Sequence, residues 1–519
     1  MKPERCEMNM NQKIPEIKND KDMKSLTISN QVSNEKVYTC EEAIDLTGTG
    51  WYIYSLVAVL AFAFEGMALD MFGLSVVVTS ACDLELTRSQ QSILLSMPLL
   101  GSVISAYPWG YIADTQGRLK GLKISLWGSF ILATLSAFSP NWIVLAVLRL
   151  GSSSFSSGIQ SLSLTLLGES CSSKIKGPSL IAVVSLIFYT FGIYSACGYF
   201  ILGLEFAYDL GFIVFSPWRL LGLVLAIPLG VSAISSIFYY ESPKFLLNTG
   251  DEKNALEILR KISERNGIKA NKYPVQKVVF NETIILNKDI PFLQSLLDQI
   301  VPLFKPPHLY RTVQLFFITS VIYSSNNGFY SWMPFLADKL NSGLEGNANS
   351  SSFCEMVSNY QELNKTSTCI ITVSEFTVWI SLMQGTMYTL LNLVLSWFSW
   401  RKKAVNITII SISVISGVCI PFANGLILSV SLYFSFLVNC LCIPIVFSYY
   451  VDIFPTSYRG MATCLGVMAA RLSALVGTNI VGAYLVNHCV GSFYSWSAFI
   501  MCGVIASIFL PPDNPKKLC

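Results

Sequence analysis

Four ionisable side chains lie inside apolar stretches where membrane-spanning helices are expected: Glu65, Asp70, Arg149 and Arg471. A charge near the centre of a bilayer costs roughly 2.5–3.5 kcal/mol on insertion scales and usually has a function there. We counted about 1.5 Å per helical residue, from the inner helix end for Glu65 and from the outer end for Arg149. This count places both residues and Arg471 near the middle of the membrane, where they could bind a charged solute or a proton.

The depths allow Glu65 and Arg149 to form a switchable ion pair, or a permanent pair that only fixes helix packing. Asp70 follows Glu65 by five residues, which is about 140° around a helix, so we expect it to point elsewhere. Arg471 has no acid in its own apolar run. It could attract an anionic solute, or it could be structural.

A second polar group lies in the run near 312–336. Asn326, Asn327 and Tyr330 offer amides and an aromatic ring at the expected depth of Glu65. These groups suit a small organic solute, although aromatic residues at helical spacing also serve packing. No catalytic pattern or metal site is evident, since His308 and His488 lie far apart and no CxxC motif is present.

The composition indicates that lipid surrounds most of this chain. The 519 residues are 52% hydrophobic and 13% charged, with a mean hydropathy of +0.53, whereas soluble domains carry about 25% charged residues. The small net charge of +3 is scattered, which argues against a nucleic-acid partner. Spanning helices need about 20 apolar residues. Runs of this kind lie near 51–78, 90–112, 122–139, 141–166, 178–203, 217–240, 312–336, 373–397, 404–422, 425–450, 460–486 and 490–510.

These runs predict an all-α membrane protein with twelve helices in two six-helix pseudo-repeats. The expected parts are an N-terminal tail at 1–50, a first bundle at 51–240, a linker with an amphipathic helix at 241–311, a second bundle at 312–510 and a tail at 511–519. Lys and Arg concentrate in loops on the side of residue 1, which is typical of the cytoplasm. We therefore expect both termini there, in a plasma membrane or an intracellular vesicle.

The longest outer loop, 337–372, has features of an extracytoplasmic segment. Asn349 and Asn364 each begin an Asn-x-Ser/Thr tripeptide, which predicts glycosylation. Cys354 and Cys369 lie in the same loop and could form a disulfide in an oxidising compartment.

A charged loop, GYIADTQGRLKG at 110–121, separates the second and third runs. The offset that aligns Glu169 with Asp452 also aligns Arg118 with Arg401, which indicates two parallel repeats. We expect a conformational latch here that holds the outward-facing state. Its members are Gly110, Asp114, Gly117, Arg118, Lys120, Glu169, Asp452 and Arg459. Asp114 would face a helix N-terminus, and Arg118 would bridge to an acid such as Glu169.

The pattern G-x-x-x-D-x-x-G-R-x-K in this loop resembles the loop between spans two and three of the major facilitator superfamily. The segment LRLGSSSFSSG at 148–158 resembles the signature of its fourth span. Segments 241–259, 302–312 and 452–460 are similar to the synaptic vesicle glycoprotein 2 group and related organic-ion carriers. Thr115 replaces the family's usual Arg, so the resemblance implies a weaker latch.

The resemblance implies a transporter that moves a small organic solute by alternating access. An organic ion is the leading hypothesis for this solute. The alternative is a membrane protein of the same fold that transports little and has a binding or regulatory role in vesicles. No enzyme activity, cofactor or metal is expected. The expected partners are the solute, the lipid bilayer and a coupling proton or ion, and we expect a monomer.

Overall fold

The computed structural model describes residues 37–172, 175, 179, 183–184, 186–268, 273–279, 300–333, 336, 352–355, 373–397, 401–454, 456–485 and 487–512. Each of the twelve predicted spans contains a helix. Nine helical segments in the described part are long and apolar enough to cross a membrane. Helices α6, α9 and α14 occupy the other three predicted positions.

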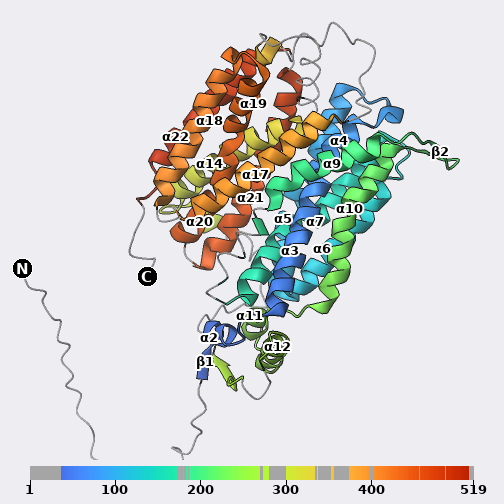
Figure 1. Ribbon diagram of the computed structural model, residues 1–519. Helices are drawn as coiled ribbons and strands as arrows, with labels where there is room; N and C mark the ends of the chain where they lie inside the picture. The colour runs from blue at the N-terminus through green and yellow to red at the C-terminus, as the bar shows by residue number, and fades with distance from the viewer. Residues whose placement is uncertain are drawn as a thin grey trace, which may run out of the picture.

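Two bundles lie side by side, one from each half of the chain (Figure 1). The first contains α3 (Trp51–Phe72), α4 (Leu74–Thr79), α5 (Arg88–Gln116), α6 (Arg118–Ser136), α7 (Trp142–Ser170), η2 (Leu186–Tyr189), α9 (Thr190–Leu202), α10 (Pro217–Ser235) and η3 (Ser236–Phe238). The second contains α14 (Leu309–Ser331), α17 (Glu375–Trp397), α18 (Lys402–Cys419), η7 (Ile420–Phe422), α19 (Leu426–Leu437), η8 (Val438–Cys442), α20 (Ile443–Ile453), α21 (Thr456–Tyr484) and α22 (Cys489–Ile508).

The bundles meet along two helix pairs, α5 with α21 and α9 with α17. Close approach in the second pair depends on glycine, since a Cβ at Gly192 would lie 2.7 Å from Leu382 Cδ2. In the first pair, Asn479 Nδ2 donates a hydrogen bond to Ser96 Oγ at 2.6 Å. The interface between the halves therefore combines tight packing with polar contacts that can break.

Local sequence determines where the helices around the polar residues begin. Thr87 starts α5 with a capping box that includes Gln90. Asn141 Oδ1 accepts from the Val144 N–H at 2.9 Å and starts α7. Gly117, with φ +109°, separates α5 from α6.

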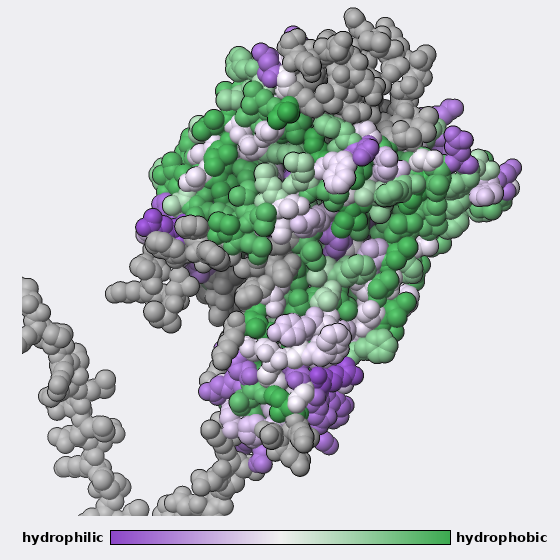
Figure 2. All heavy atoms as spheres, in the orientation of Figure 1, coloured by the Kyte–Doolittle hydropathy of each residue, from purple (hydrophilic) through white to green (hydrophobic). Residues whose placement is uncertain are grey.

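A small polar cluster lies below the first bundle, on the side that we call the linker side (Figure 1). It contains β1 (Val37–Thr39), α2 (Cys40–Asp45), α11 (Pro243–Asn248), α12 (Glu252–Arg265) and β4 (Lys277–Val279), and β1 pairs with β4 in parallel. Figure 2 shows hydrophilic residues gathered here and apolar residues over the bundles. The only other strand pair in the described part is the antiparallel β2 (Tyr208–Asp209) with β3 (Val214–Phe215).

Helix α12 lies where the amphipathic helix of the linker is expected; it begins after Asp251 and buries Leu259 and Ile262. The described end of the expected tail 1–50 folds against the linker. Cys40, Ala43 and Ile44 form a small core with Leu259, Tyr273, Val275 and Val278. These apolar positions are too few for a search for long apolar runs to detect.

Candidate functional site

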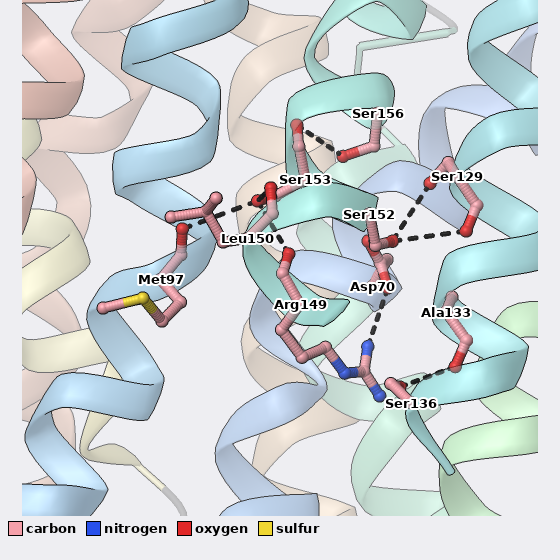
Figure 3. Close-up of polar contacts among 10 residues, drawn as sticks. All are labelled: Asp70, Met97, Ser129, Ala133, Ser136, Arg149, Leu150, Ser152, Ser153 and Ser156. Carbon is pink, nitrogen blue, oxygen red and sulfur yellow. Dashed lines mark hydrogen bonds and ion pairs between the residues drawn. The ribbon is translucent and has the colours of Figure 1, made fainter. Parts of the chain in front are cut away.

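Arg149 in α7 forms an ion pair with Asp70 in α3, and not with Glu65 as expected. Arg149 Nη1 lies 2.7 Å from Asp70 Oδ1, and the two side chains are 4% and 3% exposed (Figure 3). The prediction failed because it compared depths that had been counted from opposite ends of the helices. The expectation that Asp70 points in another direction from Glu65 agrees with this geometry.

Serine hydroxyl groups complete the surroundings of this pair. Ser152 Oγ donates to Asp70 Oδ2 at 2.7 Å and also lies 3.3 Å from Ser129 Oγ (Figure 3). Asp70 therefore accepts two short hydrogen bonds, and the one from Arg149 joins two opposite charges. The Nε atom of Arg149 has no hydrogen-bond partner in the described part of the chain.

Glu65 is 6% exposed, and its carboxylate has no ion-pair or hydrogen-bond partner among the described residues. The hydroxyl of Thr190, the first residue of α9, lies beside it but does not meet hydrogen-bond geometry. A buried polar group without a partner costs about 1–3 kcal/mol, and more when it is charged. Glu65 is therefore the least satisfied acid within the described spans.

Arg471 in α21 connects the two halves of the molecule. Its Nη2 donates a hydrogen bond to Gln160 Oε1 in α7, and the side chain is 6% exposed. No acid within ion-pair distance accompanies it in the described part of the chain. The absence of an acid agrees with the sequence, but the sequence did not indicate Gln160.

Two of the predicted polar residues of α14, Asn326 and Tyr330, contact other helices of the second bundle. Asn326 Nδ2 donates to Asn439 Oδ1, while Asn326 Oδ1 has no partner in the described residues. Asn327 Nδ2 bonds a carbonyl of its own helix. Tyr330 OH accepts from Gln384 Nε2 at 2.8 Å, which links α14 to α17.

The loop between α5 and α6 forms a charged network on the linker side. Arg118 Nε lies 3.2 Å from Glu169 Oε2, as the sequence predicted. Ser242 Oγ donates to the same carboxylate. The network therefore joins this loop and the end of α7 to the start of the linker, all within the first half of the chain.

Glu241 is a member of this network that the sequence analysis missed. Its carboxylate accepts from the backbone N–H groups of Leu119 and Lys120, at 2.9 and 3.2 Å, and so neutralises the start of α6. A Cβ at Gly117 would lie 2.5 Å from Glu241 Oε2. The glycine is thus required both by its backbone angle and by this carboxylate.

The second repeat has a counterpart of the Arg118–Glu169 pair. Lys402 Nζ lies 3.0 Å from Asp452 Oδ2, on partly exposed side chains. Gly110 faces the other half, since a Cβ there would lie 3.9 Å from Cys464 Sγ. The side chains of Asp114 and Arg459 lie outside the described residues, so their expected roles remain predictions.

Cys354 forms a disulfide with Cys489, at the start of α22, instead of with Cys369. The expected pairing assumed that a loop closes on itself, whereas this part of the loop crosses to the last helix. Cys369, Asn349 and Asn364 lie outside the described residues, so glycosylation remains a prediction.

Comparisons with known proteins identify relatives over most of the chain. A family model described as Major Facilitator Superfamily matches residues 58–478. The chain is 25% identical over 509 residues to the synaptic vesicle 2-related protein of Xenopus laevis, covering 95% of this chain and 84% of that protein. It is 30% identical over 235 residues to organic cation/carnitine transporter 7 of Arabidopsis thaliana, 44% of each chain.

A solved structure shares the fold. The inward-open xylose transporter XylE from E. coli superposes with a TM-score of 0.61 at 16% identity, covering 90% of this chain and 98% of that chain. The predicted twelve-helix architecture and the resemblance to the synaptic vesicle 2 group are thereby confirmed. The chain belongs to the major facilitator superfamily.

Proposed function

We propose that this protein carries a small organic ion across a membrane by alternating access of its two halves. The observation that carries the proposal is the Asp70–Arg149 ion pair, buried between two spanning helices. A buried ion pair often stabilises a fold no better than apolar residues of similar volume. Its presence within the spans therefore supports a functional role, and intramembrane charges commonly mark ion and substrate pathways.

The pair can couple transport to a proton or another cation. A cation that binds Asp70 weakens its attraction to Arg149, and the released guanidinium then needs another partner. Because Asp70 is in α3 and Arg149 is in α7, such a switch changes the packing of two helices of the first bundle. This gives the coupling ion a differential affinity for two conformations, which a population shift requires.

The other predicted site residues are assigned by their contacts. Glu65, Asn326, Asn327 and Tyr330 remain candidates for solute binding, with both halves contributing. Arg471 is held by Gln160 across the interface, so we assign it to a contact that breaks when the halves move. The linker side is proposed to be cytoplasmic, which places both termini in the cytoplasm.

The test is solute uptake by the purified full-length protein in proteoliposomes. A panel of organic cations and anions is measured at two internal pH values, and Arg149→Gln is compared with wild type. We expect uptake of at least one solute, which depends on the proton gradient and is lost in Arg149→Gln. Unchanged uptake in this variant would refute the assigned coupling pair.

A transport-poor protein with a binding or regulatory role in vesicles is the second candidate. The similarity to a synaptic vesicle 2-related protein over 95% of the chain favours this candidate. It predicts correctly folded protein that takes up no solute from the panel at either pH.

A further inference from the structure

We propose that Glu65 is the centre of a binding site for the ammonium group of an organic cation, shared by both halves. This inference rests on the proposed function and names its substrate class. The Glu65 carboxylate is 94% buried and its two oxygens have no hydrogen-bond partner in the described part of the chain. A buried carboxylate without a partner is costly while it is ionised, so it is either protonated or paired with a cation.

Buried protein cations of the first bundle and of the interface do not meet this need. Arg149 is paired with Asp70, and Arg471 is bonded to Gln160. Arg219 in α10 forms an ion pair with Asp83, with 3.1 Å between Nη2 and Oδ2. Helix α9, which packs beside Glu65, contains no ionisable acid or base other than tyrosine and cysteine. A cation that pairs with ionised Glu65 must therefore come from outside the described chain.

One acceptor suited to an ammonium group lies beside the carboxylate, and another is buried in the second half. Thr190 has a buried hydroxyl that lies beside Glu65 and is without a hydrogen bond in the described residues. Asn326 Oδ1 is also buried without a partner, and its orientation is determined because the Nδ2 group donates to a backbone carbonyl. These oxygens accept hydrogen bonds, which is what an N–H-bearing cation requires.

Aromatic rings connect the Glu65 side of the site to the second bundle. Phe191, next to Thr190 in the sequence, contacts Tyr330 edge to face at a centroid distance of 6.5 Å. Tyr330 in turn bonds Gln384, whose other amide atom has no described partner. Ring faces attract ammonium ions by cation–π interaction. The combination of rings with a carboxylate favours an organic cation, whose apolar atoms can pack against the rings.

The residues assigned to the proposed site come from four helices, two from each half. Glu65 and Thr190 belong to α3 and α9, while Asn326 and Gln384 belong to α14 and α17. Rocking of the halves therefore changes which groups can reach the same ammonium ion. This arrangement links release of the cation to alternating access.

The test measures binding to the purified full-length protein with two probes of the same aromatic skeleton and opposite charge. Phenethylammonium carries one positive charge, and 3-phenylpropionate carries one negative charge. We expect wild type to bind the ammonium probe and to bind the anion at least tenfold more weakly. Glu65→Gln should weaken ammonium binding at least tenfold, and Glu65→Asp should recover part of it.

Glu375→Gln is the matched control, since this exposed acid at the start of α17 is the same residue type outside the site. It should bind the ammonium probe like wild type. Binding of Glu65→Gln within twofold of wild type, preference for the anion, or no ammonium binding by wild type would overturn the site. A site at Glu65 that binds protons or Na⁺ but not the ammonium probe would also overturn it.

Binding and flux separate this inference from the proposed function. Glu65-dependent ammonium binding without any flux in proteoliposomes would leave the site in place and refute transport. Flux of an organic solute that is equal in wild type and Glu65→Gln would support transport and overturn the ammonium site.

Discussion

Removing one charge of the buried Asp70–Arg149 pair tests both stability and coupling. Asp70→Asn keeps the size of the side chain and an oxygen for Ser152, but leaves Arg149, 4% exposed, without an anion. Breaking a buried ion pair costs about 3–5 kcal/mol. We expect Asp70→Asn to lower the free energy of unfolding by an amount near the lower end of this range, because the hydrogen bond from Ser152 can remain.

The double variant Asp70→Leu with Arg149→Met separates the charge effect from packing. Apolar residues of similar volume often match or exceed a buried ion pair in stability. We therefore expect the free energy of unfolding to return to within about 1 kcal/mol of wild type. Uptake should be lost in both the single and double variants, because neither can bind and release a cation.

The assay is unfolding in mixed micelles, together with uptake in proteoliposomes. Asp452→Asn is the matched control, because its pair with Lys402 is partly exposed and should contribute at most about 1 kcal/mol. Equal stability of Asp70→Asn and the control, or a double variant less stable than the single, would refute the reasoning on buried charge. Normal uptake by the double variant would refute the coupling role.

Three further predictions concern the loop network and the disulfide. Gly117→Ala should destabilise the protein by about 1–3 kcal/mol or more, because the φ of Gly117 is +109° and the new Cβ would meet Glu241. Gly211→Ala is the control in melting experiments. Gly211 has a φ of +84° and open space around it, so this variant isolates the backbone effect. Glu241→Gln should cost about 0.3–2 kcal/mol in mixed-micelle unfolding, through weaker neutralisation of the α6 N-terminus; no loss would contradict that role. Non-reducing peptide mapping should detect the Cys354–Cys489 link, and Cys489→Ser should lower stability by about 2–5 kcal/mol; a Cys354–Cys369 peptide instead would contradict the structure.

The architecture was predictable because a bilayer imposes helix length on the sequence. A spanning helix needs about 20 apolar residues, and each such run contains a helix in the structure. The small cluster around β1 and α2 was not predictable by the same rule. Its core forms between the segment around Cys40 and the segment around Leu259, which are far apart in the sequence. Its helices and strands are also short.

The sequence predicted a contact between two site residues where both lie in segments with a recognisable pattern. The loop pattern identified Arg118, and the repeat identified Glu169 as a nearby acid; the structure pairs them. Glu241 was missed because it acts through backbone N–H groups of another helix, which carry no residue signature. The disulfide was missed for a related reason, since Cys489 approaches Cys354 only after the last helix packs in place.

Helix length explains why Arg149 pairs with Asp70 and not with Glu65, the partner expected from the sequence. The helical segments Trp51–Thr79 and Trp142–Ser170 each have 29 residues, or about 43 Å at about 1.5 Å per residue. This exceeds the apolar core of about 30 Å, so depths counted from opposite ends cannot be compared. Counted from the shared end, Asp70 is about nine residues and Arg149 about seven residues deep, whereas Glu65 is about fourteen. Depth from a shared end thus selects Asp70, and leaves Glu65 about one and a half turns deeper, free to bind a ligand.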